Sequence, residues 1–123
     1  MSKLNSLLKV IFYLYNVILI LFYLYPASLL GYILYGDSTQ QPQITVDFLK
    51  ISSNHFYLFF FLSILGILSH LNDKKINFLI IYLFLLSIIL EMLHLIIPNR
   101  AFEASDLFGN ILGTIVIVII YKI

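Results

Sequence analysis

A chain of 123 residues with 62% hydrophobic and only 11% charged residues has more apolar surface than one soluble domain of that size can bury. Its mean hydropathy of +1.04 indicates a membrane protein. The formal net charge of +1 provides no basic patch of the kind that nucleic-acid-binding proteins use. Because the chain has no cysteine, a disulfide, a zinc–thiolate site and a thiol nucleophile are excluded.

Four apolar segments are each long enough to cross a bilayer. They cover about residues 4–25, 51–71, 76–97 and 104–121, each near the roughly 20 residues that a membrane-spanning helix needs. Glycine, proline and charged residues mark the turns between them. We therefore predict an all-α integral membrane protein, a single compact four-helix bundle over residues 1–123, with an outer loop from about 26 to 50.

The first segment lies behind two lysines, as a signal peptide would. Its apolar run is much longer than the 7–15 residues of a cleavable core, and no A-x-A-like site follows it, so we interpret it as a retained anchor. Pro26 is predicted to end this helix near Tyr25, which leaves an aromatic-rich piece from Ala27 to Tyr35 in or near the membrane interface. The alternative is a kinked helix that continues to Tyr35.

The distribution of basic residues predicts the orientation. With a cytoplasmic N-terminus, two basic residues lie outside, Lys50 and Arg100, and five lie inside: Lys3, Lys9, Lys74, Lys75 and Lys122. This asymmetry favours an N-in, C-in arrangement. The loop at 26–50 and the Glu91 end of the third helix would then lie at the outer face of the cytoplasmic membrane.

Ionisable and amide side chains interrupt the third and fourth segments. A charged residue at the centre of a membrane helix costs roughly 2.5–3.5 kcal/mol on insertion scales, so such residues usually face inward and have partners. Glu91 and His94 are three residues apart and share a helix face. Asp106 and Asn110 are one turn apart on the fourth helix, and His55 begins the second. These five residues are predicted to form an outer-face polar cluster.

Small residues follow the same stripe of the fourth helix. Gly109 and Gly113 form a G-x-x-x-G pair, which suits close packing against a neighbouring helix backbone. The short turn at 98–105 makes the third helix the expected neighbour. Arg100 in this turn is predicted to join the polar cluster, reaching Glu91, Asp106 or a lipid phosphate.

The run E-x-x-H-x-x-x-P-N-R-x-x-x-x-x-D-x-x-x-N-x-x-G, from Glu91 to Gly113, resembles the C-terminal motif of the VanZ-like family of small bacterial membrane proteins. His55-Phe56 is similar to the family's histidine–phenylalanine pair, and the likeness extends from about Ser52 onward. Where the family usually has glutamine this chain has His94, and an Asp-Lys pair ahead of the histidine is missing. The resemblance implies a multi-pass envelope protein, which in some members lowers susceptibility to teicoplanin-type antibiotics.

Each polar residue also has a purely structural interpretation. Glu91 could be a protonated or arginine-paired carboxyl that locks helices together, with His94 as its hydrogen-bond partner. His55 could be an interfacial residue beside helix-capping serines. Asp106 could offset the dipole of the fourth helix from its first turn.

The spacing of Glu91 and His94 also copies the i, i+3 arrangement of carboxylate-bridged iron sites in helix bundles. Those sites need two such motifs. With His55 and Asp106 as extra ligands, this chain could supply at most a mononuclear zinc-type site, so no metal and no cofactor is expected.

Two functional hypotheses remain. The first is a non-enzymatic envelope protein whose polar cluster binds a lipid-linked or amphiphilic ligand, or a membrane protein partner. The second is an intramembrane enzyme that acts on a lipid phosphate or lipid-linked glycan, with Arg100 holding the anion and His55, His94 or Glu91 moving protons. The first is preferred, because no nucleophile motif is present.

Overall fold

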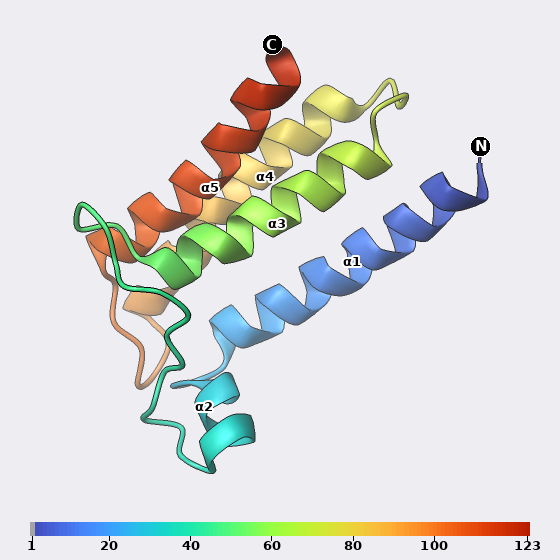
Figure 1. Cartoon of the computed structure of the whole chain (residues 1–123). Coiled ribbons are helices and arrows are strands. Elements are labelled where there is room, and N and C mark those ends of the chain that lie inside the picture. The colour runs from blue at the N-terminus through green and yellow to red at the C-terminus, as the bar shows by residue number, and fades with distance from the viewer. Residues whose placement is uncertain (1) are drawn as a thin grey trace.

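The computed structural model describes residues 2–123, which form five α-helices, one 3₁₀ turn and no β-strand. The elements are α1 (Lys3–Leu24), α2 (Leu29–Tyr35), α3 (Ser53–Ser69), α4 (Ile76–Met92), the 3₁₀ turn η1 (Leu93–Leu95) and α5 (Ala104–Lys122). The helices α1, α3, α4 and α5 have 17–22 residues each, and Figure 1 shows the short α2 beyond the end of α1. The predicted all-α fold is confirmed.

Three of the helices are long and apolar enough to cross a membrane: α1, the continuous run Ile76–Leu95, and α5. Their outward faces carry large apolar side chains that are more than half exposed, among them Leu14, Leu21, Phe78 and Ile120. Exposing this much apolar surface to water is unfavourable, whereas contact with lipid tails is not. The chain is therefore a membrane protein. At 17 residues, α3 is a shorter apolar helix.

The centre of the fold is α3, which packs against α1, α4 and α5. One hydrophobic core joins α1, α3 and α4 around the fully buried Phe59, Leu62 and Leu83. A second, smaller core joins α3, α4 and α5 around Ile67, Ile76 and Ile117. Because α3 contacts every other long helix, its polar and small residues face neighbouring helices instead of lipid.

The predicted G-x-x-x-G seam exists, but its partner is α3 and not α4. A Cβ on Gly113 would lie 2.6 Å from the carbonyl oxygen of Phe56, and one on Gly109 would lie 2.6 Å from that of Ser52. Thr114 continues the seam and accepts a hydrogen bond from Ser63 at 3.3 Å. The expectation that the short turn selects the packing partner was wrong, since close contact requires small residues on facing backbones and not only proximity along the chain.

The first helix ends where Pro26 predicts. α1 stops at Leu24, and Ala27 has a φ of 76°, a left-handed conformation that no helix can continue through. Ser28 then starts α2 by accepting a hydrogen bond from the backbone N–H of Gly31 at 2.9 Å. The predicted loop of residues 26–50 therefore contains a separate short helix, and the kinked continuation to Tyr35 is wrong.

The long helices alternate in direction, so the connections gather at two ends (Figure 1). Both chain ends and the turn between α3 and α4 lie at one end. The segment from the end of α1 to the start of α3, and the segment between η1 and α5, lie at the other. The predicted polar residues are at this second end.

Candidate functional site

A polar cavity of about 710 Å³ occupies the second end of the bundle. It is bounded by the segment between α2 and α3, the first turns of α3 and α5, and the segment after η1. Four residues of the predicted cluster are in its wall: His55, His94, Arg100 and Asp106. Side chains that the sequence analysis did not select complete it, including Asp47, Ser52, Asn54 and Glu103.

Glu91 and His94 form the predicted pair, and both are buried. His94 Nδ1 lies 3.2 Å from Oε1 of Glu91, while His94 Nε2 lies 2.9 Å from the carbonyl oxygen of Tyr23. A carbonyl only accepts hydrogen bonds, so the Nε2 atom carries a proton. The hydrogen bond between Nδ1 of His94 and Oε1 of Glu91 then needs one further proton. A proton on Nδ1 makes the contact an ion pair, and a proton on Oε1 makes it a neutral carboxyl–imidazole pair.

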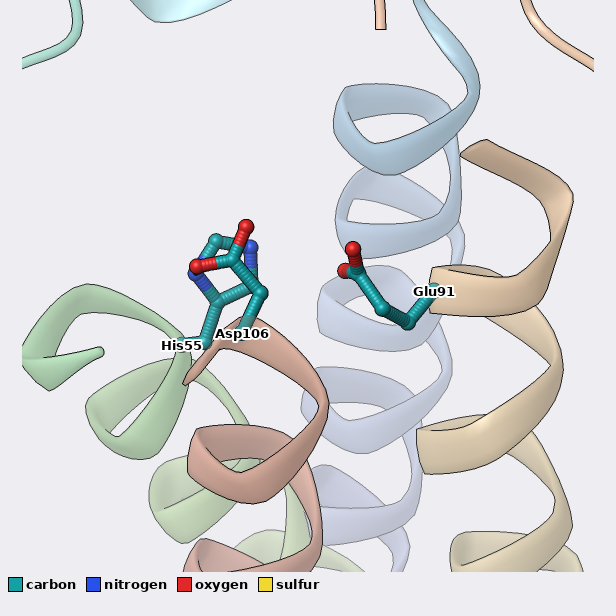
Figure 2. Close-up of side chains that lie close together, drawn as sticks. All are labelled: His55, Glu91 and Asp106. Carbon is teal, nitrogen blue, oxygen red and sulfur yellow. The ribbon is translucent and has the colours of Figure 1, made fainter. Parts of the chain in front are cut away.

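The two oxygens of Glu91 differ in their partners. Oε1 also accepts a hydrogen bond from the backbone N–H of Glu103 at 3.1 Å. Oε2 is buried and has no hydrogen-bond partner within residues 2–123. An unpaired buried carboxylate oxygen is costly, because it has lost water without a replacement. Figure 2 shows this carboxylate directed across the bundle toward His55 and Asp106.

His55 and Asp106 form a second pair at the cavity wall. Nδ1 of His55 lies 3.2 Å from Oδ1 of Asp106 and 2.9 Å from the hydroxyl of Ser52. Ser52 precedes α3 but makes no side-chain cap bond, so it positions the histidine instead of capping the helix as expected. One ligand atom from each of His55, Asp106 and Glu91 can be chosen so that all three lie within 4.8 Å of one another.

Tyr23 joins the two histidines and was not predicted. Its buried ring stacks on His94 with the centroids 5.8 Å apart, and it meets the His55 ring edge-on at 5.2 Å. Its hydroxyl donates to Oδ1 of Asn110 at 2.5 Å, and the amide of Asn110 donates to the carbonyl of Ser87 at 3.0 Å. Asn110 therefore connects α1, α4 and α5 beneath the cavity. The chain has nine tyrosines, and only the position of Tyr23 one turn before Pro26 could have distinguished it.

Arg100 has partners other than the predicted ones. Its Nη2 atom donates to the carbonyl of Phe22 at 2.6 Å, and its Nε atom donates to that of Tyr25 at 3.0 Å. No ion pair joins it to Glu91 or Asp106 within the described residues. Phe22 would normally bond to the N–H four residues later, but that residue is Pro26, which has none. Arg100 thus satisfies the carbonyl that proline leaves open, and partial burial lowers the pKa of its guanidinium.

Asp47 fixes the loop wall of the cavity. Its carboxylate accepts the backbone N–H of Ser53 at 3.1 Å and the side-chain amide of Gln43 at 2.8 Å. These hydrogen bonds, that of Ser53 first, hold the pKa of Asp47 below its ordinary value. Asp47 supplies the α3 cap that Ser52 does not. No local sequence pattern predicts this cap, because the acid is six residues from the helix start.

Comparison of the chain with protein families, curated proteins and solved structures finds no match. The VanZ-like resemblance therefore stays a prediction.

Proposed function

We propose that the chain is a multi-pass protein of a bacterial cytoplasmic membrane in which α3 is a fourth crossing. Two features support this. α3 packs among the three longer helices, and its 17 residues extend about 25 Å at 1.5 Å per residue. Five lysines belong to the segments at the end with the chain termini, where Lys9 contacts Asp73 of the turn between α3 and α4. Lys50, in the segment before α3, and Arg100, in the cavity wall, belong to the other end. By the positive-inside rule, the cavity would open at the outer face.

The proposed activity is binding, without catalysis, of the polar head group of an amphiphile or lipid-linked molecule. The observation that carries it is the position of the 710 Å³ polar cavity at the end of a bundle whose outer surface is apolar. A ligand with a polar head and a hydrocarbon tail would place its head in the cavity and its tail along the exposed helices. A volume of 300–1,000 Å³ is typical of small-molecule sites.

The lining favours one kind of head group. Hydroxyl and amide side chains predominate, including Ser28, Ser38, Thr39, Gln41, Gln43, Ser52 and Asn54. The lining also has three carboxylates, of Asp47, Glu103 and Asp106, and one guanidinium, that of Arg100, whose Nε and Nη2 atoms already donate to backbone carbonyls. A simple phosphate would meet repulsion from these acids, whereas hydroxyls and ammonium groups would find acceptors. A glycan or amine-bearing head group fits best.

This function agrees with membership of the VanZ-like family, which we propose on the motif from Glu91 to Gly113. Sequestering a lipid-linked envelope precursor would change what a glycopeptide of the teicoplanin type meets at the cell surface. A membrane protein partner that bears such a head group is a second form of the same proposal.

The alternative is an intramembrane enzyme acting on a lipid phosphate or lipid-linked glycan. The observation in its favour is the pair of acid–imidazole contacts, Glu91–His94 and His55–Asp106, on one cavity. Such pairs can move protons. Arg100, which the enzymatic hypothesis needs for the anion, is instead largely occupied by the end of α1.

The test has two parts: the amphiphile bound to the purified protein is identified, and the lipid-linked precursors are measured in cells with and without the protein. Mass spectrometry of protein in native nanodiscs should find a co-purifying amphiphile on the wild type, and reduced occupancy on Asp47→Asn. The matched control is Asp73→Asn, since Asp73 also accepts a backbone N–H, from Lys75, but lies at the opposite end of the bundle. Precursor pools in cells with and without the protein should have the same chemical composition.

A new product in the expressing cells would contradict the binding function and support the enzyme. Equal amphiphile occupancy in the two aspartate variants would show that lipid binds the apolar surface without using the cavity.

A further inference from the structure

Three potential metal ligands from three different helices converge beside the cavity. His55 comes from α3, Glu91 from α4 and Asp106 from α5, and one ligand atom of each lies within 4.8 Å of the others. Figure 2 shows their side chains directed toward a common space. Acidic residues are often close without binding an ion, so proximity alone is insufficient.

The independent observation is the buried Oε2 atom of Glu91. The side chain is fully buried, yet this oxygen has no hydrogen-bond partner within the described residues. Oε1 of the same carboxyl is held from two sides, by His94 and by the backbone N–H of Glu103. The carboxyl is thus fixed in orientation while its other oxygen is left without a donor. A bound cation would supply the missing partner.

The imidazole of His55 is arranged in the same way. Its Nδ1 atom faces the Ser52 hydroxyl and Asp106, and the Nε2 atom takes part in none of these contacts. A metal-binding histidine usually has one ring nitrogen on the metal and the other on a carboxylate or hydroxyl that orients the ring. The Ser52 hydroxyl provides that second contact here, at 2.9 Å from Nδ1.

We propose that His55, Glu91 and Asp106 bind one divalent cation of the zinc type. A tetrahedral zinc site has ligands about 2.0–2.2 Å from the metal and therefore about 3.3–3.6 Å apart, so movements of the side-chain atoms by about 1–1.5 Å would complete it. A nitrogen with two carboxylates suits zinc or a similar transition metal, whereas calcium needs six to eight oxygens. A fourth ligand would come from the cavity, because His55 and Asp106 are both in its wall.

This site goes beyond head-group binding and does not depend on it. It would also neutralise acids that repel phosphate, so a metal-loaded cavity could accept an oxygen of a head group as the fourth ligand. The metal and the amphiphile can be measured separately, so each proposal can fail alone.

The experiment uses the full chain, purified in detergent with a tag that contains no histidine. After chelator treatment, the protein is incubated with zinc chloride, separated from free metal by gel filtration, and its metal content is measured by mass spectrometry. We expect one zinc per chain for the wild type and less than a tenth of that for Glu91→Gln. Asp73→Asn, at the opposite end of the bundle, should retain full content.

The visible absorption spectrum of bound cobalt(II) is a second measurement, and it reports the coordination of the metal independently of whether the protein is folded. The wild type should show intense visible bands of a four-coordinate site, and His55→Gln should lose them while keeping a monodisperse gel-filtration profile. Zinc affinity should fall by more than about 100-fold in either variant, since loss of even an outer-shell partner costs 10–100-fold. Equal zinc content in wild type and Glu91→Gln, or a six-coordinate cobalt spectrum in the wild type, would overturn the site.

Discussion

Arg100 holds the end of α1, and its removal should be costly. The side chain makes two charge-assisted hydrogen bonds to backbone carbonyls, of Phe22 and Tyr25. Bonds of this kind contribute roughly 1.5–3 kcal/mol each, which sets an upper range of roughly 3–6 kcal/mol for the pair. Since the side chain is only partly buried, water replaces part of that loss. We expect Arg100→Ala to lower the free energy of unfolding in detergent by about 2–3 kcal/mol, and Arg100→Lys by about half as much.

The proline explains why this arginine is needed, and it provides a direct check. Pro26→Ala restores an N–H that can continue the helical bond to the Phe22 carbonyl. Arg100→Ala should therefore cost less in the Pro26→Ala background, with a coupling of about 1 kcal/mol within the range for contacting residues. The free energies would be measured by denaturant titration of the four proteins in the same detergent.

Two results would refute this account. An equal cost of Arg100→Ala in both backgrounds would show that the guanidinium does not replace the missing N–H. A strong coupling of Arg100→Ala with Asp106→Asn would show that Arg100 and Asp106 form the ion pair that the sequence predicted and that is absent from the described residues. We expect that second cycle to be additive within about 0.5 kcal/mol.

Three further predictions concern packing, pH and topology. Gly113→Ala should lower the melting temperature more than Gly66→Ala, because the added Cβ meets rigid α3 backbone at 2.6 Å in the first case and the movable end of a phenylalanine ring at 2.9 Å in the second. The pKa of Asp47 is lower in the folded state, so the hydrogen bonds that its carboxylate accepts should be fully formed above the unfolded-state pKa of about 3.9 and be lost as the pH falls through the folded-state pKa. Hydrogen exchange of the backbone amides at the start of α3 would detect this loss. Cysteines at Val46 and Asn72, both exposed, should differ in labelling by an impermeant reagent in intact cells, and labelling of the Asn72 site alone would reverse the orientation.

The parts of the structure that the sequence predicted are local in the chain. The end of α1 followed from Pro26, since proline acts on its own turn. The Glu91–His94 contact followed from the i, i+3 spacing of helical side chains. The long helices followed from apolar length, although α3 is two residues shorter than its predicted segment at each end. At its C-terminal end, the side chains of Ser69 and His70 contact the Gly66 carbonyl.

What the sequence could not predict depends on contacts between distant segments. Arg100 was paired with the nearest carboxylates, yet its partners are carbonyls about 75 residues earlier. Nothing in the sequence marks a backbone carbonyl as unsatisfied until the helix end is known. Tyr23 was missed for a similar reason: a tyrosine near a membrane boundary is ordinarily an interfacial anchor, and only packing reveals its buried hydroxyl.

The polar groups at this end of the bundle divide into two sets by what they already bind. One set fastens the end of α1 to the other helices: the Tyr23 hydroxyl on Asn110, the Tyr23 carbonyl on His94, and Arg100 on the last carbonyls of the helix. Their hydrogen-bonding capacity is largely used, so they explain stability better than they explain ligand binding.

The other set, which consists of Glu91, His55 and Asp106, contains a polar atom that no group of the described chain satisfies. Oε2 of Glu91 has no partner in the described chain, and one ligand atom each of His55 and Asp106, two residues of the cavity wall, lies within 4.8 Å of an oxygen of this carboxyl. A buried carboxylate oxygen that receives no donor is stable only if something outside the chain compensates it, or if the group gives up its charge. Substitutions in the first set should therefore reduce folded yield, whereas substitutions in the second should leave yield unchanged and remove whatever the cavity holds. Glu91 belongs to both sets, because its Oε1 atom supports His94 while its Oε2 atom is open, and Glu91→Gln separates the two roles since the amide can keep the first contact without providing a charged ligand.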